Sequence, residues 1–247
     1  MNKVFGVDVG GSFIKMGLVD VMTGKVDGFQ SIELPSPSTP SNILNAIQYY
    51  IPYEATAVGL GVPTIVKNNK MLTGPHIDPE WRTINVHELA EKVLALPCAF
   101  LNDADAAAIA EINFGAMRNL NGVTIMLTFG TGIGTAIYHD DELLYNTEFG
   151  RMALPGGIDN AENIAAAIVK KVNNLTWEQY ANNVNIYLAE LNKCFWPDHV
   201  VIGGGVSEVW DEWSHLLKAP FEIHKAQLGN SAGVIGAAIY ASLSCTH

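Results

Sequence analysis

The spacing of apolar residues divides the first part of the chain into strand-like and helix-like stretches. Two apolar runs, residues 4–9 and 13–19, flank a Gly10-Gly11 turn, and this pattern is typical of a β-hairpin. A third strand is expected over residues 25–34. The later elements expected here are a helix over residues 41–50, a buried strand over 55–62, an amphipathic helix over 86–94 and a short strand over 97–101. Three strands followed by helix, strand, helix and strand predict a mixed α/β region.

The last of these strands runs directly into a polar segment, Asn102-Asp103-Ala104-Asp105, which precedes an alanine-rich helix over residues 106–114. Side chains at the carboxyl end of a strand lie where open α/β sheets bind ligands. We expect Asp105 to cap the helix, because an aspartate at that place accepts hydrogen bonds from free backbone N–H groups. Asp103 then remains available to face a cleft and to accept a proton from a hydroxyl group.

The strand-and-turn pattern of the start returns after Gly122. A strand over residues 123–129, the turn Gly130-Thr131-Gly132-Ile133-Gly134 and a strand over 135–138 repeat the organisation of the first hairpin. Glycines lack a Cβ atom, so the backbone N–H groups of such turns can approach a phosphate closely. Two regions that each open with a glycine hairpin therefore predict a duplicated fold that holds a phosphate group between its two lobes.

The remainder of the chain is predicted to be mostly helical around one buried strand. The expected elements are helices over residues 161–171 and 176–195, a strand over 200–202, and helices over 207–217 and 232–243. The strand leads into a third glycine turn, Gly203-Gly204-Gly205, ahead of the next helix. A glycine turn before a helix N-terminus suits the close approach of a nucleotide or another phosphate-bearing ligand.

Three polar residues surround the first glycine turn. Asp8 lies in the apolar run just before it, and Ser12 and Lys15 follow it. A carboxylate at such a place can hold Mg²⁺ or its water shell. Taken alone, the stretch also fits an ordinary hairpin with one stray aspartate, and the two later glycine turns favour the phosphate site.

Composition and charge exclude several classes of protein. The chain has 247 residues, more than the ~100–150 most common for one domain, and 49% of them are hydrophobic, which allows a large core. It has no run of 18 or more apolar residues and begins with a strand pattern rather than a signal peptide, so we expect a cytoplasmic protein without a membrane partner. The net charge of −11 argues against nucleic acid as a partner. The scattered cysteines Cys98, Cys194 and Cys245 predict neither a disulfide framework nor a zinc knuckle.

Four motifs occur in the order found in one family of sugar kinases. They are Asp8-x-Gly10-Gly11-Ser12-x-x-Lys15, Asn102-Asp103-Ala104-Asp105-Ala106-Ala107, Leu127-Thr128-Phe129-Gly130-Thr131-Gly132-Ile133-Gly134 and Ile202-Gly203-Gly204-Gly205-Val206-Ser207. On these residues the chain resembles the ROK family over essentially its whole length, and within it the bacterial glucokinases that use polyphosphate. The resemblance implies an α/β protein with a two-lobed, actin-like ATPase fold and an interlobe cleft. We expect a small lobe of residues 1–105 with the C-terminal helix, about 231–247, and a larger lobe of residues 106–230.

The resemblance also implies a role for each candidate residue. Asp103 would be the general base that accepts the proton of the sugar 6-hydroxyl group, and Asn102 and Glu148 would hydrogen-bond sugar hydroxyls. Asp8 would lie near Mg²⁺, through water. The transferred phosphates would be cradled by Gly10, Gly11, Ser12, Lys15, Gly130, Thr131 and Gly132, and adenosine would lie at Gly203, Gly204 and Gly205. Glucose or a related hexose, Mg²⁺, polyphosphate or ATP as the donor, and a homodimeric state complete this expectation.

Two residues depart from the family pattern. Many relatives have Glu-x-Gly-His where this chain has Glu148-Phe149-Gly150-Arg151, and His76 stands where the polyphosphate subgroup usually has asparagine. Arg151 and His76 are therefore candidates for the sugar pocket, and neutral change on the pocket rim is the alternative. The cysteine-rich zinc motif of many ROK proteins is absent, so we expect no zinc.

Three functions stay open at this point. The leading one is phosphorylation of glucose. In the second, the substrate is another hexose, such as mannose or an N-acyl hexosamine, because Arg151 is longer than histidine and permanently charged. The third is a non-catalytic sugar-sensing regulator, since ROK relatives include transcriptional repressors. Those repressors carry an N-terminal helix-turn-helix domain, whereas here the fold is expected to begin at residue 3.

Overall fold

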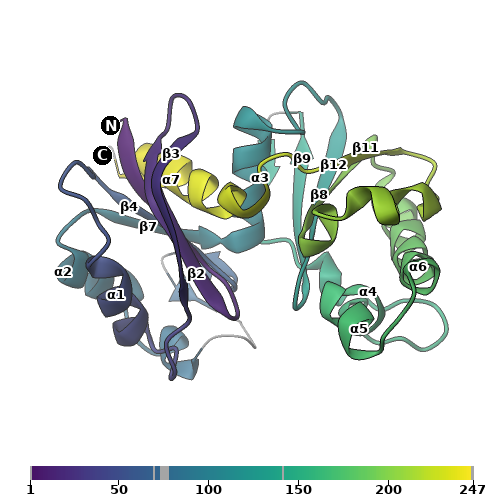
Figure 1. Ribbon diagram of the computed structural model, residues 1–247, viewed down its shortest axis with the longest axis horizontal. Helices are drawn as coiled ribbons and strands as arrows, with labels where there is room; N and C mark the ends of the chain where they lie inside the picture. The colour runs from purple at the N-terminus through teal and green to yellow at the C-terminus, as the bar shows by residue number, and fades with distance from the viewer. Residues whose placement is uncertain (1, 69, 73–77, 141, 246–247) are drawn as a thin grey trace. The chain divides into compact units, whose positions relative to one another are not determined.

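The computed structural model describes residues 2–68, 70–72, 78–140 and 142–245 (Figure 1). The chain divides into two compact units. Unit 1 consists of Met1–Phe114 and Asn230–His247, and unit 2 of Gly115–Gly229. Each unit is built on one five-stranded sheet with helices packed against it, which confirms the predicted α/β class.

The sheet of unit 1 has the strand order β3-β2-β1-β4-β7. Its strands are β1 (Lys3–Val9), β2 (Phe13–Asp20), β3 (Lys25–Glu33), β4 (Val58–Val62) and β7 (Cys98–Asn102). The first three strands pair antiparallel, and β4 and β7 continue the sheet in the direction of β1. The predicted hairpin and meander are thus confirmed.

Helices cover both faces of this sheet. They are α1 (Pro40–Gln48), α2 (Val86–Leu94), α3 (Asp103–Phe114) and α7 (Ala232–Ser244), and the small elements β5 (Val66–Lys67), β6 (Lys70–Met71) and η1 (Pro79–Arg82) lie between β4 and α2. Apolar residues of α1 and α2 share one core cluster with Phe5 and Val7 of β1. Helix α1 begins at Pro40, one residue earlier than predicted, because the Thr39 side chain accepts a hydrogen bond from the Asn42 N–H and Pro40 occupies the first helical turn.

The C-terminal helix α7 packs on the face of this sheet opposite to α1 and α2, where it contacts β1 and β4. The two ends of the chain, the yellow helix and the purple first strand of Figure 1, therefore belong to one unit. This contact is close enough to require glycine. A Cβ atom on Gly59 of β4 would collide with the carbonyl oxygen of Ala237, and one on Gly236 would collide with the carbonyl oxygen of Ala106 in α3. The small residues of α7 therefore let its backbone lie directly against the sheet and α3.

The sheet of unit 2 repeats this plan with the order β10-β9-β8-β11-β12. Its strands are β8 (Val123–Phe129), β9 (Ile133–His139), β10 (Glu142–Leu144), β11 (His199–Gly204) and β12 (Glu222–Lys225). Again three strands pair antiparallel, and the last two run parallel to the first of them. The predicted repeat of strand, glycine turn and strand is confirmed.

The helices of unit 2 differ from the prediction in two places. They are α4 (Glu162–Ala165), α5 (Ala167–Val172) and α6 (Trp177–Phe195), and the 3-10 turns are η2 (Phe149–Arg151), η3 (Gly205–Ser207), η4 (Trp210–Glu212) and η5 (Ser214–Leu216), with η6 (Gly229–Ser231) at the border of the units. The single helix expected over residues 161–171 is broken at Ala166, whose backbone is extended.

In the described residues no helix is long and apolar enough to cross a membrane.

The helix predicted over residues 207–217 is wrong. Three separate 3-10 turns take its place, because the buried indole of Trp213 sets the path of this segment. Its Nε1 donates to the Val206 carbonyl oxygen at 3.0 Å, and its ring stacks on Trp177 at 5.9 Å between centroids. Burying one large aromatic ring outweighs the modest helical preference of the segment.

Candidate functional site

The hairpin of unit 1 brings Asp8 and Lys15 directly opposite each other on β1 and β2. The Lys15 Nζ lies 3.9 Å from the Asp8 Oδ2, and both side chains are partly buried. The carboxyl group also lies against Gly233 in the first turn of α7. Burial raises the pKa of Asp8, and the positive charge of Lys15 opposes that shift. A second positive charge near Asp8 would therefore further favour the ionised form of its carboxyl group.

The turn next to Asp8 is open to solvent. The Gly10 N–H donates to the Phe13 carbonyl oxygen at 2.9 Å, while Gly11 and Ser12 are exposed. A Cβ atom on Gly10 would come within 3.1 Å of that same oxygen, so the tight turn favours glycine there. The arrangement leaves a surface of backbone and small side chains, as a phosphate cradle requires.

The hairpin of unit 2 carries its own glycine turn, which neighbouring helices fix in place. The Gly130 N–H donates to the Gly132 carbonyl oxygen at 3.0 Å, and the Ile168 N–H of α5 donates to the Gly130 carbonyl oxygen at 3.1 Å. On the inner side, Glu162 accepts from the Ile133 N–H at 3.0 Å. A Cβ atom on Gly130 would meet no atom within 4 Å, and both Gly130 and Thr131 are exposed. Packing within the described residues does not explain why residue 130 is glycine.

The third glycine turn is mostly explained by the fold. A Cβ atom on Gly203 would come within 3.3 Å of both Ala226 and Met126, and Gly204 has φ +80° and would collide with the backbone of Phe129. Only Gly205 faces open space. Because the expected helix is absent, the helix N-terminus predicted to bind a phosphate after this turn is also absent among the described residues.

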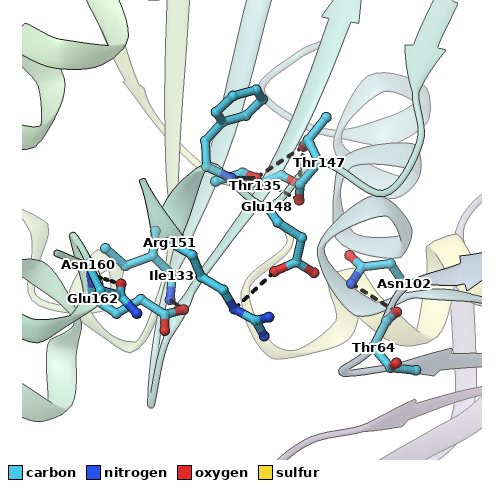
Figure 2. A network of polar contacts seen from close by, with 10 residues as sticks. Thr64, Asn102, Ile133, Thr135, Thr147, Glu148, Arg151, Asn160 and Glu162 are labelled. Carbon is cyan, nitrogen blue, oxygen red and sulfur yellow. Dashed lines mark hydrogen bonds and ion pairs between the residues drawn. The ribbon is translucent and has the colours of Figure 1, made fainter. Parts of the chain in front are cut away.

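Asn102, rather than Asp105, caps helix α3 in unit 1. The Asn102 Oδ1 accepts from the N–H groups of Ala104 at 2.9 Å and Asp105 at 3.1 Å. Its Nδ2 donates to the Thr64 carbonyl oxygen at 3.3 Å, a contact drawn in Figure 2. The prediction that Asp105 is the cap is wrong, because the helix starts at Asp103 and Asp105 is a buried residue of its first turn. Asn102 thus ties β4 and β7 to the start of α3.

Asp103 is the first residue of α3 and directly follows β7. Its side chain is half-buried, and its Oδ1 accepts from the Ala104 N–H at 2.9 Å. A helix N-terminus favours a negatively charged side chain. The strand end and the Asn102 cap together hold this carboxylate at the carboxyl edge of the parallel strands.

Glu148 and Arg151 of unit 2 form an ion pair (Figure 2). The Arg151 Nε lies 3.4 Å from the Glu148 Oε2 across one turn of η2. Burial raises the pKa of Glu148, the charge of Arg151 lowers it, and the charge of Glu162 raises it. Arg151 therefore helps to keep the half-buried Glu148 ionised.

Two threonines that the sequence pattern did not single out hold this loop in place. The Thr135 Oγ1 donates to the Thr147 carbonyl oxygen at 2.8 Å, and the Thr147 Oγ1 donates to the Thr135 carbonyl oxygen at 2.7 Å. The Phe149 N–H donates to the Thr135 Oγ1 at 3.1 Å (Figure 2). Gly150 fits beneath Ile133, where a Cβ atom would collide with the carbonyl oxygen. Nothing in the local sequence distinguishes Thr135 from an ordinary strand residue or Thr147 from an ordinary loop residue.

The predicted site residues thus fall into separate groups within the two units. Unit 1 contains Asp8 with its turn, and Asn102 with Asp103, and unit 2 contains the turns at Gly130 and Gly203 and the pair Glu148–Arg151. His76, the remaining candidate, lies outside the described residues.

Comparisons with known proteins point to one family. Residues 4–152 match the ROK family. The chain is 37% identical over 247 residues to the polyphosphate glucokinase of Mycobacterium tuberculosis, an alignment that covers 98% of this chain and 92% of that protein.

Two solved structures are similar over nearly the whole chain. The inorganic polyphosphate/ATP-glucomannokinase of Arthrobacter sp. strain KM has a TM-score of 0.92 at 31% identity, with 99% of this chain and 100% of that chain covered. The ROK family glucokinase of Streptomyces griseus in complex with glucose and AMPPNP has a TM-score of 0.84 at 26% identity, with 98% and 99% covered.

Proposed function

Because the chain belongs to the ROK family, we propose that it is a kinase that transfers a phosphoryl group from inorganic polyphosphate or ATP to the 6-hydroxyl group of glucose. The observation that carries the proposal is the 37% identity to a polyphosphate glucokinase over 98% of the chain. The place of Asp103 at the end of β7 supports it, since a phosphoryl transfer to a hydroxyl group needs a positioned carboxylate.

Asp103 acts as the general base of this reaction. Its carboxylate accepts the proton of the glucose 6-hydroxyl group while a bond forms between that oxygen and the terminal phosphorus of the donor. The bond between this phosphorus and the bridging oxygen of the donor breaks, and the shortened donor leaves with the electron pair. Asn102 holds the first turn of α3 in position through the two backbone hydrogen bonds of its Oδ1. Its Nδ2 donates one hydrogen to the Thr64 carbonyl oxygen and has a second hydrogen to donate to a sugar hydroxyl.

Asp8 holds Mg²⁺, through water. The environment of Asp8 suits Mg²⁺. Its carboxylate is partly buried and has one cation, the Lys15 Nζ, at 3.9 Å, and a second positive charge would further stabilise the ionised form. The ion, when bound, spreads the negative charge that develops on the transferred phosphoryl group. Lys15 supplies fixed positive charge on the neighbouring strand.

The glycine turns bind the donor. Gly130 and Gly205 support this role, because a Cβ atom on either would meet no atom of the protein within 4 Å and a side chain there would instead occupy the space of a ligand. The same role is proposed for Gly10, Gly11 and Ser12 in unit 1 and for Thr131 and Gly132 in unit 2, and Gly203 and Gly204 shape the turn that places Gly205.

Glu148 binds sugar hydroxyl groups and Arg151 positions it. The ion pair at 3.4 Å supports a positioning role for Arg151, in place of a direct contact with the sugar. His76 remains a proposed part of the sugar pocket. The proposal also includes a homodimeric state, a cytoplasmic location and turnover without zinc.

Mannose is the second candidate substrate. The specific observation in its favour is the likeness to a protein described as a glucomannokinase, at 31% identity over 99% of the chain. A discriminating test supplies glucose, mannose and N-acetylglucosamine separately, each with Mg²⁺ and with either ATP or long-chain polyphosphate. The proposal expects glucose to have the highest kcat/KM. A higher value for another hexose would reassign the substrate, and no product from any pair would overturn the kinase assignment.

A further inference from the structure

Three metal-ligating side chains meet on the β11–β12 edge of the unit 2 sheet, and the kinase chemistry uses none of them. They are His199 of β11 and Glu222 and His224 of β12. The parallel register places His199 beside Glu222 and Val201 beside His224. Since residues two apart on a strand point to the same face, all three side chains lie on one face of this strand pair.

The distances between the ligand atoms match a metal site. The His199 Nδ1 lies 3.2 Å from the His224 Nε2, and each of these nitrogens lies 3.5 Å from the Glu222 Oε2. In a tetrahedral zinc site with bonds of about 2.0–2.1 Å, neighbouring ligand atoms are about 3.3 Å apart. The three atoms therefore form a triangle of the same size as one face of such a tetrahedron.

We propose that His199, Glu222 and His224 bind one divalent transition metal ion of the zinc type, through Nδ1, Oε2 and Nε2, with water as the fourth ligand. Two imidazoles and one carboxylate are a ligand set that zinc accepts, whereas Mg²⁺ and Ca²⁺ prefer oxygen ligands alone. This site contains no cysteine, so the missing cysteine-rich motif does not bear on it.

The environment of the imidazoles favours ligation. Both histidines are mostly buried, with side-chain exposures of 18% for His199 and 29% for His224, while Glu222 is 73% exposed. The exposed carboxylate leaves a path for the ion to enter from solvent.

The consequence of binding is local. Strand β12 has four residues and pairs within its sheet only with β11 among the described strands. An ion held by one side chain of β11 and two of β12 links this edge strand to the sheet. Binding therefore stabilises the folded protein by mass action, and it leaves the residues of the proposed kinase site untouched.

The test measures metal binding by the full chain after treatment with a chelator. Calorimetric titration with Zn²⁺ is expected to give one ion per chain, and Co²⁺ in its place is expected to give the intense visible absorption of a tetrahedral site. His199→Ala and His224→Ala should each weaken binding by more than the roughly tenfold that even an outer-shell change costs. Glu222→Gln, at an exposed position that tolerates substitution, should also weaken it.

His87→Ala is the matched control, because His87 pairs with one carboxylate, that of Glu91 at 3.8 Å, and belongs to no three-ligand group in the described chain. It should bind Zn²⁺ and Co²⁺ as the wild type does. At a given Zn²⁺ concentration the Tm of the wild type and of this control should rise by more than that of Glu222→Gln. Wild-type binding no tighter than that of Glu222→Gln, or a wild type without tetrahedral Co²⁺ absorption, would overturn the proposal and leave an ordinary hydrogen-bonded histidine pair.

Discussion

In unit 1 the glycine hairpin joins β1 to β2 and places Asp8 opposite Lys15, whereas in unit 2 the hairpin joins β8 to β9 and places Thr128 opposite Gly134. The two sheets share one strand order, and the residue pair second from the turn differs in charge between them. The two residues of this pair are charged in unit 1 and uncharged in unit 2. Under the proposed function, Mg²⁺ binds at the charged hairpin of unit 1, and the glycine turns of both units bind donor phosphates.

A second contrast lies at the carboxyl ends of the parallel strands. In unit 1, β7 passes directly into α3, and Asn102 caps that helix at Asp103. In unit 2, β11 passes into the Gly203–Gly205 turn and a series of 3-10 turns. A rigid helix start suits a residue that must hold one carboxylate in place, and a glycine turn suits the close approach of a phosphate-bearing ligand.

The largest expected effect comes from Asp103→Asn. The substitution keeps the shape of the side chain and removes the base, so kcat should fall by about 10²–10⁴-fold. Calorimetry should show that glucose still binds, and the Tm should stay close to that of the wild type. A variant with full turnover would remove Asp103 from the mechanism.

Asp8→Asn tests the charged hairpin against the uncharged one. Loss of a group that holds the shell of a metal ion should lower activity or Mg²⁺ affinity by about 10–100-fold, measured as the Mg²⁺ dependence of turnover. The matched change in unit 2 is Thr128→Ser, which occupies the equivalent place before the turn and should leave the Mg²⁺ dependence unchanged. Equal effects of both changes would contradict the division of roles.

Glycine-to-alanine changes separate ligand binding from packing. Gly130→Ala meets no atom within 4 Å and should alter the free energy of unfolding by no more than about 1 kcal/mol, while it raises the KM for the donor. Gly204 has φ +80°, and a Cβ atom there would collide with the backbone of Phe129, so Gly204→Ala should lower the free energy of unfolding by more than about 1 kcal/mol. Denaturant titration and donor kinetics check the two changes together, and an unaltered donor KM in Gly130→Ala would argue against the cradle.

Arg151→Gln should change the pH profile more than the maximal rate. Because the charge of Arg151 lowers the pKa of Glu148, its removal raises that pKa further and reduces the ionised fraction at a given pH. The acidic limb of kcat/KM for glucose should therefore move to higher pH. A profile identical to that of the wild type would show that Arg151 does not act through Glu148.

The smallest expected effect is on stability as a function of pH. Burial raises the pKa of Asp8 above its ordinary value of 3.8, so the folded state holds this proton to higher pH than the unfolded state does. The stability that results is present below that ordinary value and is lost as pH rises through the raised pKa. Denaturant titrations without Mg²⁺ should show a shallower fall with pH for Asp8→Asn than for the wild type, and parallel curves would contradict the buried carboxylate.

Local patterns in the sequence were sufficient for the glycine hairpins, for strands β1 to β4, β7 and β11, and for the place of Asp103, but they did not predict β5, β6 or β12. They failed for the segment after β11 and for the cap of α3. The helix expected over residues 207–217 is replaced by 3-10 turns, because burial of Trp213 against Trp177 of another element sets its path. The cap of α3 is Asn102 rather than Asp105, since the helix starts before its alanine-rich run.

Contacts that depend on strand register could not be predicted from the sequence either. The mutual hydrogen bonds of Thr135 and Thr147 join residues 12 apart, and the group of His199, Glu222 and His224 joins two strands that are separate along the chain. Each residue taken singly is ordinary, and only the pairing of β11 with β12 brings the two histidines within 3.2 Å.

In the proposed reaction, Asp103 serves a phosphoryl transfer to the 6-hydroxyl group of glucose. Its most direct test is ³¹P NMR of wild type and Asp103→Asn, each incubated with glucose, Mg²⁺ and long-chain polyphosphate, and then with ATP. We predict a glucose 6-phosphate resonance from the wild type with at least one of the two donors, and from Asp103→Asn a rate about 10²–10⁴-fold lower. A wild type that yields no such resonance with either donor, or an Asp103→Asn variant that yields it at the wild-type rate, would contradict the account.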